Sequence, residues 1–153
     1  MGEKAVVAPM LTDAMINSGR TLVGQLDERD LSPDAAFWLY RPDRGDWTLL
    51  FAEAKFETQG PHWAYSRIRD VLAAAPQVFP ELTLESISLA SPRSPLVSLL
   101  RAAVSTGPGS NIAGVRFTGN VINGVLIEDA YIYRLRPDEA TRRGGSPERP
   151  PRG

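Results

Sequence analysis

Two apolar runs constrain the fold of this chain more than any other feature: AAFWLYR at 35–41 and WTLLFAEAKF at 47–56, joined by PDRGD. Aromatic and aliphatic residues on both sides of a short loop that contains Pro and Gly are typical of a β-hairpin. Both faces of this hairpin are apolar. We therefore expect helices to cover it on at least one side, with the second side open to a partner.

The pairing of the two strands decides which side chains share a face. A loop centred on Arg44 would place on one face the cross-strand pairs Phe37–Phe51, Leu39–Leu49 and Ala35–Glu53. The opposite face would then hold Trp38, Tyr40, Leu50 and Ala52. This register makes Trp38, Tyr40 and the nearby Trp47 the candidate interface residues, because aromatic side chains are enriched at the centres of protein interfaces.

Three helices are predicted around this hairpin. Thr12 is a candidate N-cap for an amphipathic helix that runs to about Glu28, in which Gly19 and Gly24 either permit a close approach or bend the helix. A second helix begins at Gly60-Pro61 and ends at Pro76. Ser94 as N-cap and Pro95 as first residue begin the third helix.

The remaining segments predict three more strands and two irregular ends. LESISLA at 84–90 reads as a short strand, and residues 114–135 as a hairpin with its turn at Asn120 or at Asn123-Gly124. The predicted order is α-β-β-α-β-α-β-β, an α+β domain over residues 10–135 with a largely antiparallel sheet of about five strands and three helices. Residues 1–9 are expected to form a flexible arm, and the Arg-, Pro- and Gly-rich residues 136–153 a disordered tail.

Composition excludes several classes of site. The chain has 153 residues, enough for one domain with a sizeable core, and its formal net charge of -1 argues against nucleic acid or an anionic membrane as partner. The absence of Cys excludes disulfides, thiolate zinc sites and cysteine nucleophiles. The N-terminal residues do not have the pattern of a signal peptide, and no apolar stretch is long enough to span a bilayer, so a cytoplasmic location is expected.

One charged pattern has catalytic potential. Asp43, Glu53 and Lys55 resemble the acidic, acidic and lysine residues of restriction-endonuclease-like nucleases, and that resemblance implies a divalent ion, Mg²⁺ or Mn²⁺, held by the carboxylates. In the predicted hairpin, however, Asp43 lies in the turn, too far along the strand to share an ion with Glu53. Asp34, which that register places beside Ala54, is the substitute, so the nuclease hypothesis uses Asp34, Glu53 and Lys55. The competing interpretation is that Glu53 and Lys55 mark the charged end of a strand.

Other candidate residues are single side chains or loops, and each has an ordinary structural interpretation beside the functional one. His62 is the only histidine and is followed by Trp63 in the first turn of the second predicted helix, and the two are the candidate ligand-binding residues of a small-ligand sensor. The competing interpretation is that His62 is an exposed or helix-capping side chain. The loop STGPGSNIAG at 105–114 has the glycines of a phosphate-binding loop but lacks the Gly-Lys-Ser/Thr ending, and it reads as a connection.

The segments TQGPHWAYSRIRDVLA and GVRFTGNVINGVLIEDAYIYRL resemble those of small bacterial α/β proteins with no assigned activity. This resemblance covers most of residues 10–135 and transfers no function. The sequence favours a non-enzymatic protein-interaction or dimerisation module, which binds a protein partner or a second copy. The alternatives are the metal-dependent nuclease and a small-ligand sensor domain.

Overall fold

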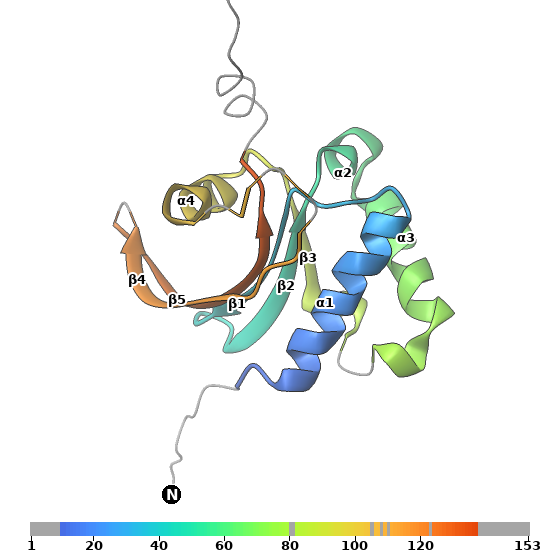
Figure 1. Ribbon diagram of the computed structural model, residues 1–153, viewed down its shortest axis with the longest axis horizontal. Helices are drawn as coiled ribbons and strands as arrows, with labels where there is room; N and C mark the ends of the chain where they lie inside the picture. Colours follow the sequence, from blue (N-terminus) through green and yellow to red (C-terminus); the bar gives the residue numbers. More distant parts are fainter. Residues whose placement is uncertain are drawn as a thin grey trace, which may run out of the picture.

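The computed structural model describes residues 10–79, 82–104, 106–107, 109, 111–122 and 124–137, and these form an α+β domain (Figure 1). The helices are α1 (Asp13–Glu28), α2 (Ala54–Gln59), α3 (Pro61–Ala74) and α4 (Pro95–Ala103). The strands are β1 (Ala35–Arg41), β2 (Asp46–Ala52), β3 (Ile87–Ala90), β4 (Val115–Ile122) and β5 (Val125–Leu135). The predicted fold class and element order are confirmed, with α2 as an unpredicted addition. The predicted arm at 1–9 and nearly all of the predicted tail lie outside the described residues.

The described strands form one sheet in the order β3-β2-β1-β5-β4. All neighbouring pairs are antiparallel except β2 and β3, which are parallel. The connection from β2 to β3 contains α2 and α3, and a crossover of this length is what a parallel pair requires. The largely antiparallel sheet predicted from the sequence is therefore confirmed, with one parallel pair at the β3 edge.

Helices cover both faces of the sheet (Figure 1). Helices α1 and α3 bury Leu22, Leu26 and Ile68 against one face, where Trp38 and Phe51 lie. On the other face α4 buries Val97 and Leu100 in a cluster that includes Phe37. The face of the β1–β2 hairpin that was expected to be open to a partner is therefore covered in part by α4.

The hairpin register differs by one residue from the prediction. Ala35 pairs with Ala52, Phe37 with Leu50 and Tyr40 with Trp47. Arg41 and Asp46 close a loop with an even number of residues, which ends at Gly45 with φ 67°. Since side chains alternate along a strand, the shift by one residue moves every β2 side chain to the opposite face. Trp38 therefore shares its face with Trp47, Leu49 and Phe51 rather than with Leu50 and Ala52.

Gly19 allows α1 to lie close to the sheet. A Cβ atom at this position would lie 2.9 Å from Trp38 Nε1 and closer still to the Tyr133 hydroxyl. These two groups form a hydrogen-bond chain, in which Trp38 Nε1 donates to Tyr133 Oη at 3.0 Å and Tyr133 Oη donates to the carbonyl oxygen of Ile16 at 2.5 Å. A Cβ atom added at Gly24, by contrast, would have nothing within 4 Å. Of the two predicted roles, Gly19 has the close approach.

The third strand is shorter than predicted. Residues 84–86 form a 3-10 turn, and β3 begins only at Ile87. Ser86 Oγ donates to the carbonyl oxygen of Thr83 at 2.7 Å and accepts from the Thr83 N–H at 3.0 Å. Local side-chain hydrogen bonds of this kind compete with extended backbone, which is why the strand starts after them.

The β4–β5 hairpin bends around α4 (Figure 1). Its strands end at Ile122 and resume at Val125, with Gly124 at φ 82°, so the turn lies at the second of its two predicted positions. Ile127 and Ala130 both belong to the cluster beneath α4, although a regular strand would direct residues three apart to opposite faces. Gly119, in the middle of β4, has φ 60°. The backbone of the hairpin therefore departs from regular strand geometry at this level.

Candidate functional site

Glu53 and Lys55 do not share a strand face, which corrects the geometry of the nuclease hypothesis. Strand β2 ends at Ala52, and Glu53 is the N-cap of α2, where its Oε2 accepts from the Lys55 N–H at 3.1 Å. Lys55 lies in α2, and its Nζ donates to the carbonyl oxygen and to Oδ2 of Asp30 at 2.8 and 3.1 Å. Glu53 therefore caps a helix, and Lys55 binds the end of α1.

Asp34 lies one position away from where the predicted register placed it. Its N–H donates to the carbonyl oxygen of Ala52 at 2.8 Å, which places Asp34 next to Glu53 rather than Ala54. Burial raises the pKa of Glu53 from 4.5, the Lys55 N–H lowers it, and the charge of Asp34 raises it further. The Asp34 carboxylate itself forms an ion pair with Arg136 at 3.3 Å. The two carboxylates are neighbours, but Lys55 is directed toward Asp30 instead.

The described residues give the metal-dependent nuclease no support beyond this proximity. No group of three or more His, Cys, Asp or Glu side chains among them is placed to hold a metal ion. Asp43 lies in the β1–β2 loop, as predicted, at the opposite end of the hairpin from Glu53.

The predicted aromatic interface lies mostly inside the molecule. Trp38 has 0% of its surface exposed and Trp47 has 8%, while Tyr40 is half-buried and packs on Trp47 with 5.5 Å between ring centroids. All three pack in the cluster under α1 and α3. The assignment of Trp38 as an interface residue is wrong, because a fully buried side chain cannot contact a partner. The reason is that α1 and α3 cover the face of the sheet on which Trp38 lies.

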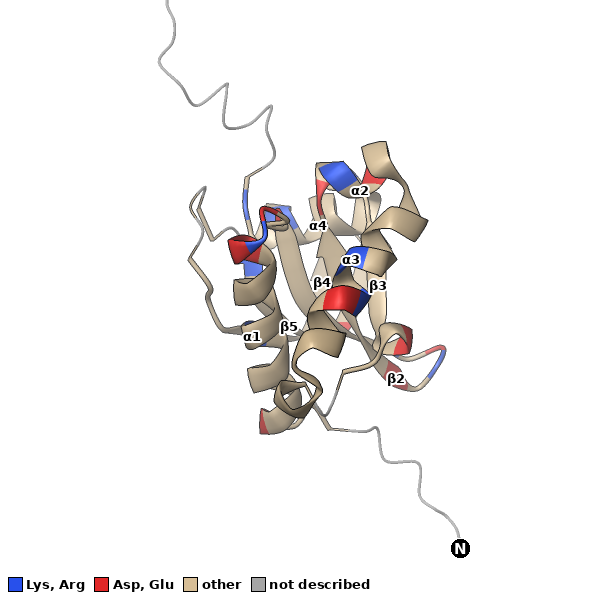
Figure 2. Cartoon of the chain, turned by 90° about the vertical axis from the view of Figure 1, so that its right-hand side faces the viewer, with Lys and Arg blue, Asp and Glu red and all other residues tan. Residues whose placement is uncertain are grey.

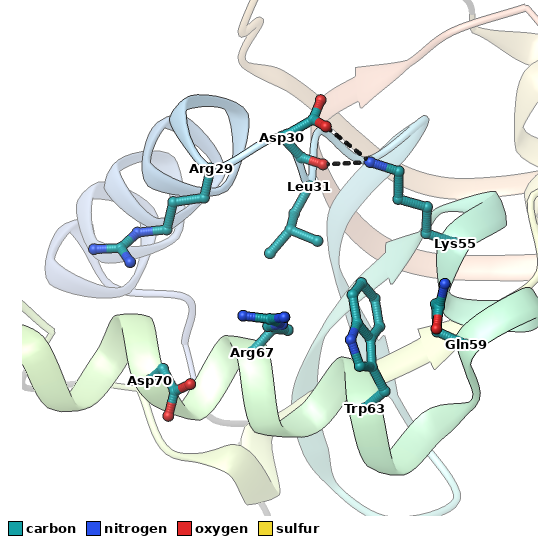
Figure 3. A pocket seen from close by; sticks show the side chains of 8 residues that line it. All are labelled: Arg29, Asp30, Leu31, Lys55, Gln59, Trp63, Arg67 and Asp70. Carbon is teal, nitrogen blue, oxygen red and sulfur yellow. Dashed lines mark hydrogen bonds and ion pairs between the residues drawn. The ribbon is translucent and has the colours of Figure 1, made fainter.

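Trp63 and Lys55 lie in one pocket, here called the Trp63 pocket, with a volume of about 400 Å³ (Figure 3). Its lining comes from the end of α1, from α2 and from α3: Arg29, Asp30, Leu31, Lys55, Gln59, Trp63, Arg67 and Asp70. The guanidinium of Arg67 lies 5.3 Å from the centroid of the Trp63 ring. His62, in the first turn of α3, is exposed and is not part of the lining. Sequence reasoning missed Arg67, although a Trp and an Arg four residues apart on a helix predict this contact.

A second concave surface lies near α4. This apolar groove, of about 360 Å³, includes Leu39, Leu50, Leu96, Val125 and Ile127 in its lining. The tip of the β4–β5 hairpin, which forms part of this lining, exposes Val121 by 67%, Val125 by 47% and Leu126 by 58%. Among the described residues only Met10 and Val78 are other large hydrophobic side chains with comparable exposure. The sequence did not indicate this concentration, because the tip reads as ordinary turn-flanking strand.

Electrostatic contacts fix the segment between α1 and β1. Arg134, fully buried on β5, donates to both carboxylate oxygens of Asp27 at 2.9 Å and to Ser32 Oγ at 3.2 Å. Burial alone raises the pKa of Asp27, but hydrogen bonds from Arg134 and Ser32 and the charges of Arg134 and Arg136 outweigh it, so the pKa lies below 3.8. The contacts hold the end of α1, which forms one wall of the Trp63 pocket.

Comparison with known proteins identifies no relatives: no protein family matches this chain, and no curated protein or solved structure is significantly similar to it. None of the helices in the described part of the chain is long and apolar enough to cross a bilayer.

Proposed function

We propose that this protein is an interaction module that self-associates through the tip of its β4–β5 hairpin. The observation that carries this proposal is the concentration of exposed Val121, Val125 and Leu126 at one hairpin tip. Fully burying an aliphatic side chain contributes about 1.5–3 kcal/mol, so a surface that leaves three of them in water gains from a partner that covers them.

A second copy is the partner that the surface fits best. Each molecule has an apolar tip and an apolar groove, whose lining includes Leu39, Leu50 and Leu96 and, from the tip itself, Val125 and Leu126. A twofold contact would place each tip against the groove of the other copy, because such a contact uses the same surface on both molecules. The groove also contains Arg41, Asp43 and Glu128, which give its rim polar groups of both signs.

The adjacent edge strand adds to this surface. Strand β4 pairs only with β5 among the described strands, and Arg116 is its single charged residue. That charge is already bound, because Arg116 donates two hydrogen bonds of 2.7 Å to the Asp129 carboxylate. Edge strands with few free charges are prone to pair with other strands. A stable interface buries about 1,200–2,000 Å² in total, so tip, groove and edge would have to act together.

Sedimentation velocity of three proteins tests the proposal. The wild type is expected to form a dimer that Leu126→Asp dissociates, because a carboxylate at the tip would have to be desolvated. Val78→Asp is the matched control: it places the same charge on an exposed valine of η1 (Pro76–Val78), away from the hairpin, and should leave the dimer intact. Circular dichroism checks that both variants are folded. A wild type that stays monomeric at all concentrations, or a Leu126→Asp variant that remains dimeric, contradicts self-association through the tip.

A further inference from the structure

We infer that the Trp63 pocket is a binding site for a small molecule that combines a planar aromatic ring with one anionic group, a phosphate or a carboxylate. The pocket lies between α1, α2 and α3, on the opposite side of the sheet from the apolar groove, so this inference is independent of the proposed self-association (Figure 1). Its volume of about 400 Å³ falls within the range of about 300–1,000 Å³ that is usual for small-molecule sites.

The charge of the lining favours an anion. The lining contains three positive side chains, Arg29, Lys55 and Arg67, and two negative ones, Asp30 and Asp70, so its formal net charge is +1. The chain as a whole has a net charge of -1, and charges of both signs occur along α3 and at the end of α1 (Figure 2). The positive charge of the lining is therefore a local feature of this pocket. Neither Arg29 nor Arg67 forms an ion pair with a carboxylate in the described part of the chain. Their guanidinium groups are free to bind a phosphate or a carboxylate through paired N–H donors.

Trp63 supplies a surface for a flat ring. Its indole is half-buried, and Leu31 lies across the pocket from it (Figure 3). The Arg67 guanidinium lies over this ring at 5.3 Å from the centroid, which favours its position next to the aromatic wall. A ring that packs against Trp63 would therefore bring its anionic substituent within reach of a positioned arginine.

Lys55 is held at the rim in a way that leaves it available. Its Nζ donates to the backbone carbonyl of Asp30 at 2.8 Å, a contact that does not depend on the Asp30 side chain. The accompanying ion pair with the Asp30 carboxylate is 3.1 Å long, and that carboxylate is on a side chain that is 98% exposed. Exposed ion pairs of this kind contribute little to stability, so an anionic ligand can replace the Asp30 carboxylate while the backbone contact keeps Lys55 in place.

The backbone at Asp30 points to the same site. Asp30 has φ 61° and is the only described residue other than glycine with a positive φ. It lies just after α1 in a Schellman arrangement, with the Leu31 N–H donating to the carbonyl of Leu26 at 2.9 Å and the Asp30 N–H to that of Asp27 at 3.3 Å. Glycine is the usual residue at this position. An aspartate here goes against local preference, and such departures concentrate at binding sites.

Calorimetric titration with four probes tests the inference. Adenosine 5′-monophosphate and indole-3-acetate combine a ring with a phosphate or a carboxylate, whereas adenosine and inorganic phosphate each have one part only. At least one of the two combined probes should bind with 1:1 stoichiometry and at least about tenfold more tightly than either single-part probe. Which combined probe binds distinguishes a phosphate from a carboxylate ligand.

Three variants assign the binding to the pocket. Arg67→Gln and Trp63→Leu should each lower the affinity for the combined probe by about tenfold or more, since each removes the side chain that recognises one of its two parts. Arg69→Gln is the matched control, because Arg69 is exposed on the same helix and does not line the pocket. The substitution changes the net charge of the protein by the same amount as Arg67→Gln. Arg67→Gln keeps the test valid should Trp63→Leu fail to fold. Failure of both combined probes to bind, or equal weakening by Arg67→Gln and Arg69→Gln, would overturn the inference.

Discussion

Alanine substitutions at the two glycines of α1 should change stability in opposite directions. Gly24 lies in the helix interior with nothing within 4 Å of the added methyl position, so Gly24→Ala gains helix propensity without a steric cost. The free energy of unfolding should rise by about 0.5–1 kcal/mol.

Gly19→Ala gains the same propensity but meets the sheet. Its methyl group would lie 2.9 Å from Trp38 Nε1 and from Tyr133 Cε2, and both side chains are fully buried. The two rings are linked by hydrogen bonds from Trp38 to Tyr133 and from Tyr133 to the carbonyl oxygen of Ile16, and a shift of either ring would strain these bonds. Overpacking costs about 1–3 kcal/mol, and a lost buried hydrogen bond adds about 1 kcal/mol. After the gain in propensity, we expect a net destabilisation of about 2 kcal/mol.

Urea unfolding followed by tryptophan fluorescence and by circular dichroism measures both variants against the wild type. The two probes should give coincident transitions, which is the condition for comparing free energies. The difference between Gly24→Ala and Gly19→Ala should be about 3 kcal/mol. If Gly19→Ala is as stable as Gly24→Ala, the close approach of α1 to Trp38 and Tyr133 is wrong.

Three further predictions concern the polar contacts at the end of α1. Arg134→Met removes the buried arginine that binds both oxygens of the Asp27 carboxylate and should cost about 3–5 kcal/mol in urea unfolding, whereas Asp27→Leu combined with Arg134→Met should recover much of that loss. The pKa of Asp27 is below 3.8 in the folded state, so its stabilising contribution is present above that pH and is lost as the pH falls through the folded pKa. The unfolding free energy of the wild type minus that of Asp27→Asn should therefore decrease on acidification in that range, and a constant difference would contradict the ion pair. Asp30→Gly places a glycine at the positive φ and should stabilise the folded state by about 0.5–1 kcal/mol, which would be measured as a higher melting temperature. A lower melting temperature would contradict the strain assigned to Asp30.

Local sequence signals predicted most of the elements. Thr12 caps α1 by accepting from the Met15 N–H at 3.1 Å, and Ser94 caps α4 by accepting from the Val97 N–H at 3.3 Å. The glycine turn of the second hairpin also lies at one of the positions predicted for it. Each of these features depends on residues within three or four positions of one another, which is why the sequence alone was sufficient.

The candidate site could be predicted only in part. Trp63 and Lys55 were identified as residues of interest but were assigned to different hypotheses, because they lie in different predicted elements and no local pattern joins them. Arg29 and Asp30 enter the pocket from the far end of α1. Such a pocket exists only once α1, α2 and α3 have packed, so no local pattern could have assembled it.

By itself, the sequence determined the α+β class, the order of the elements and the helix caps, since these follow from periodicity and from short-range hydrogen bonds. Tertiary structure decided which face of the sheet each side chain occupies. An even-numbered loop in place of an odd one changed which β2 residues share a face with Trp38, the packing of α1 and α3 buried Trp38, and the N-cap at Glu53 ended β2 before Lys55. A shift of one residue changes the local pattern hardly at all but exchanges the two faces of a strand, so burial against the helices selects the register.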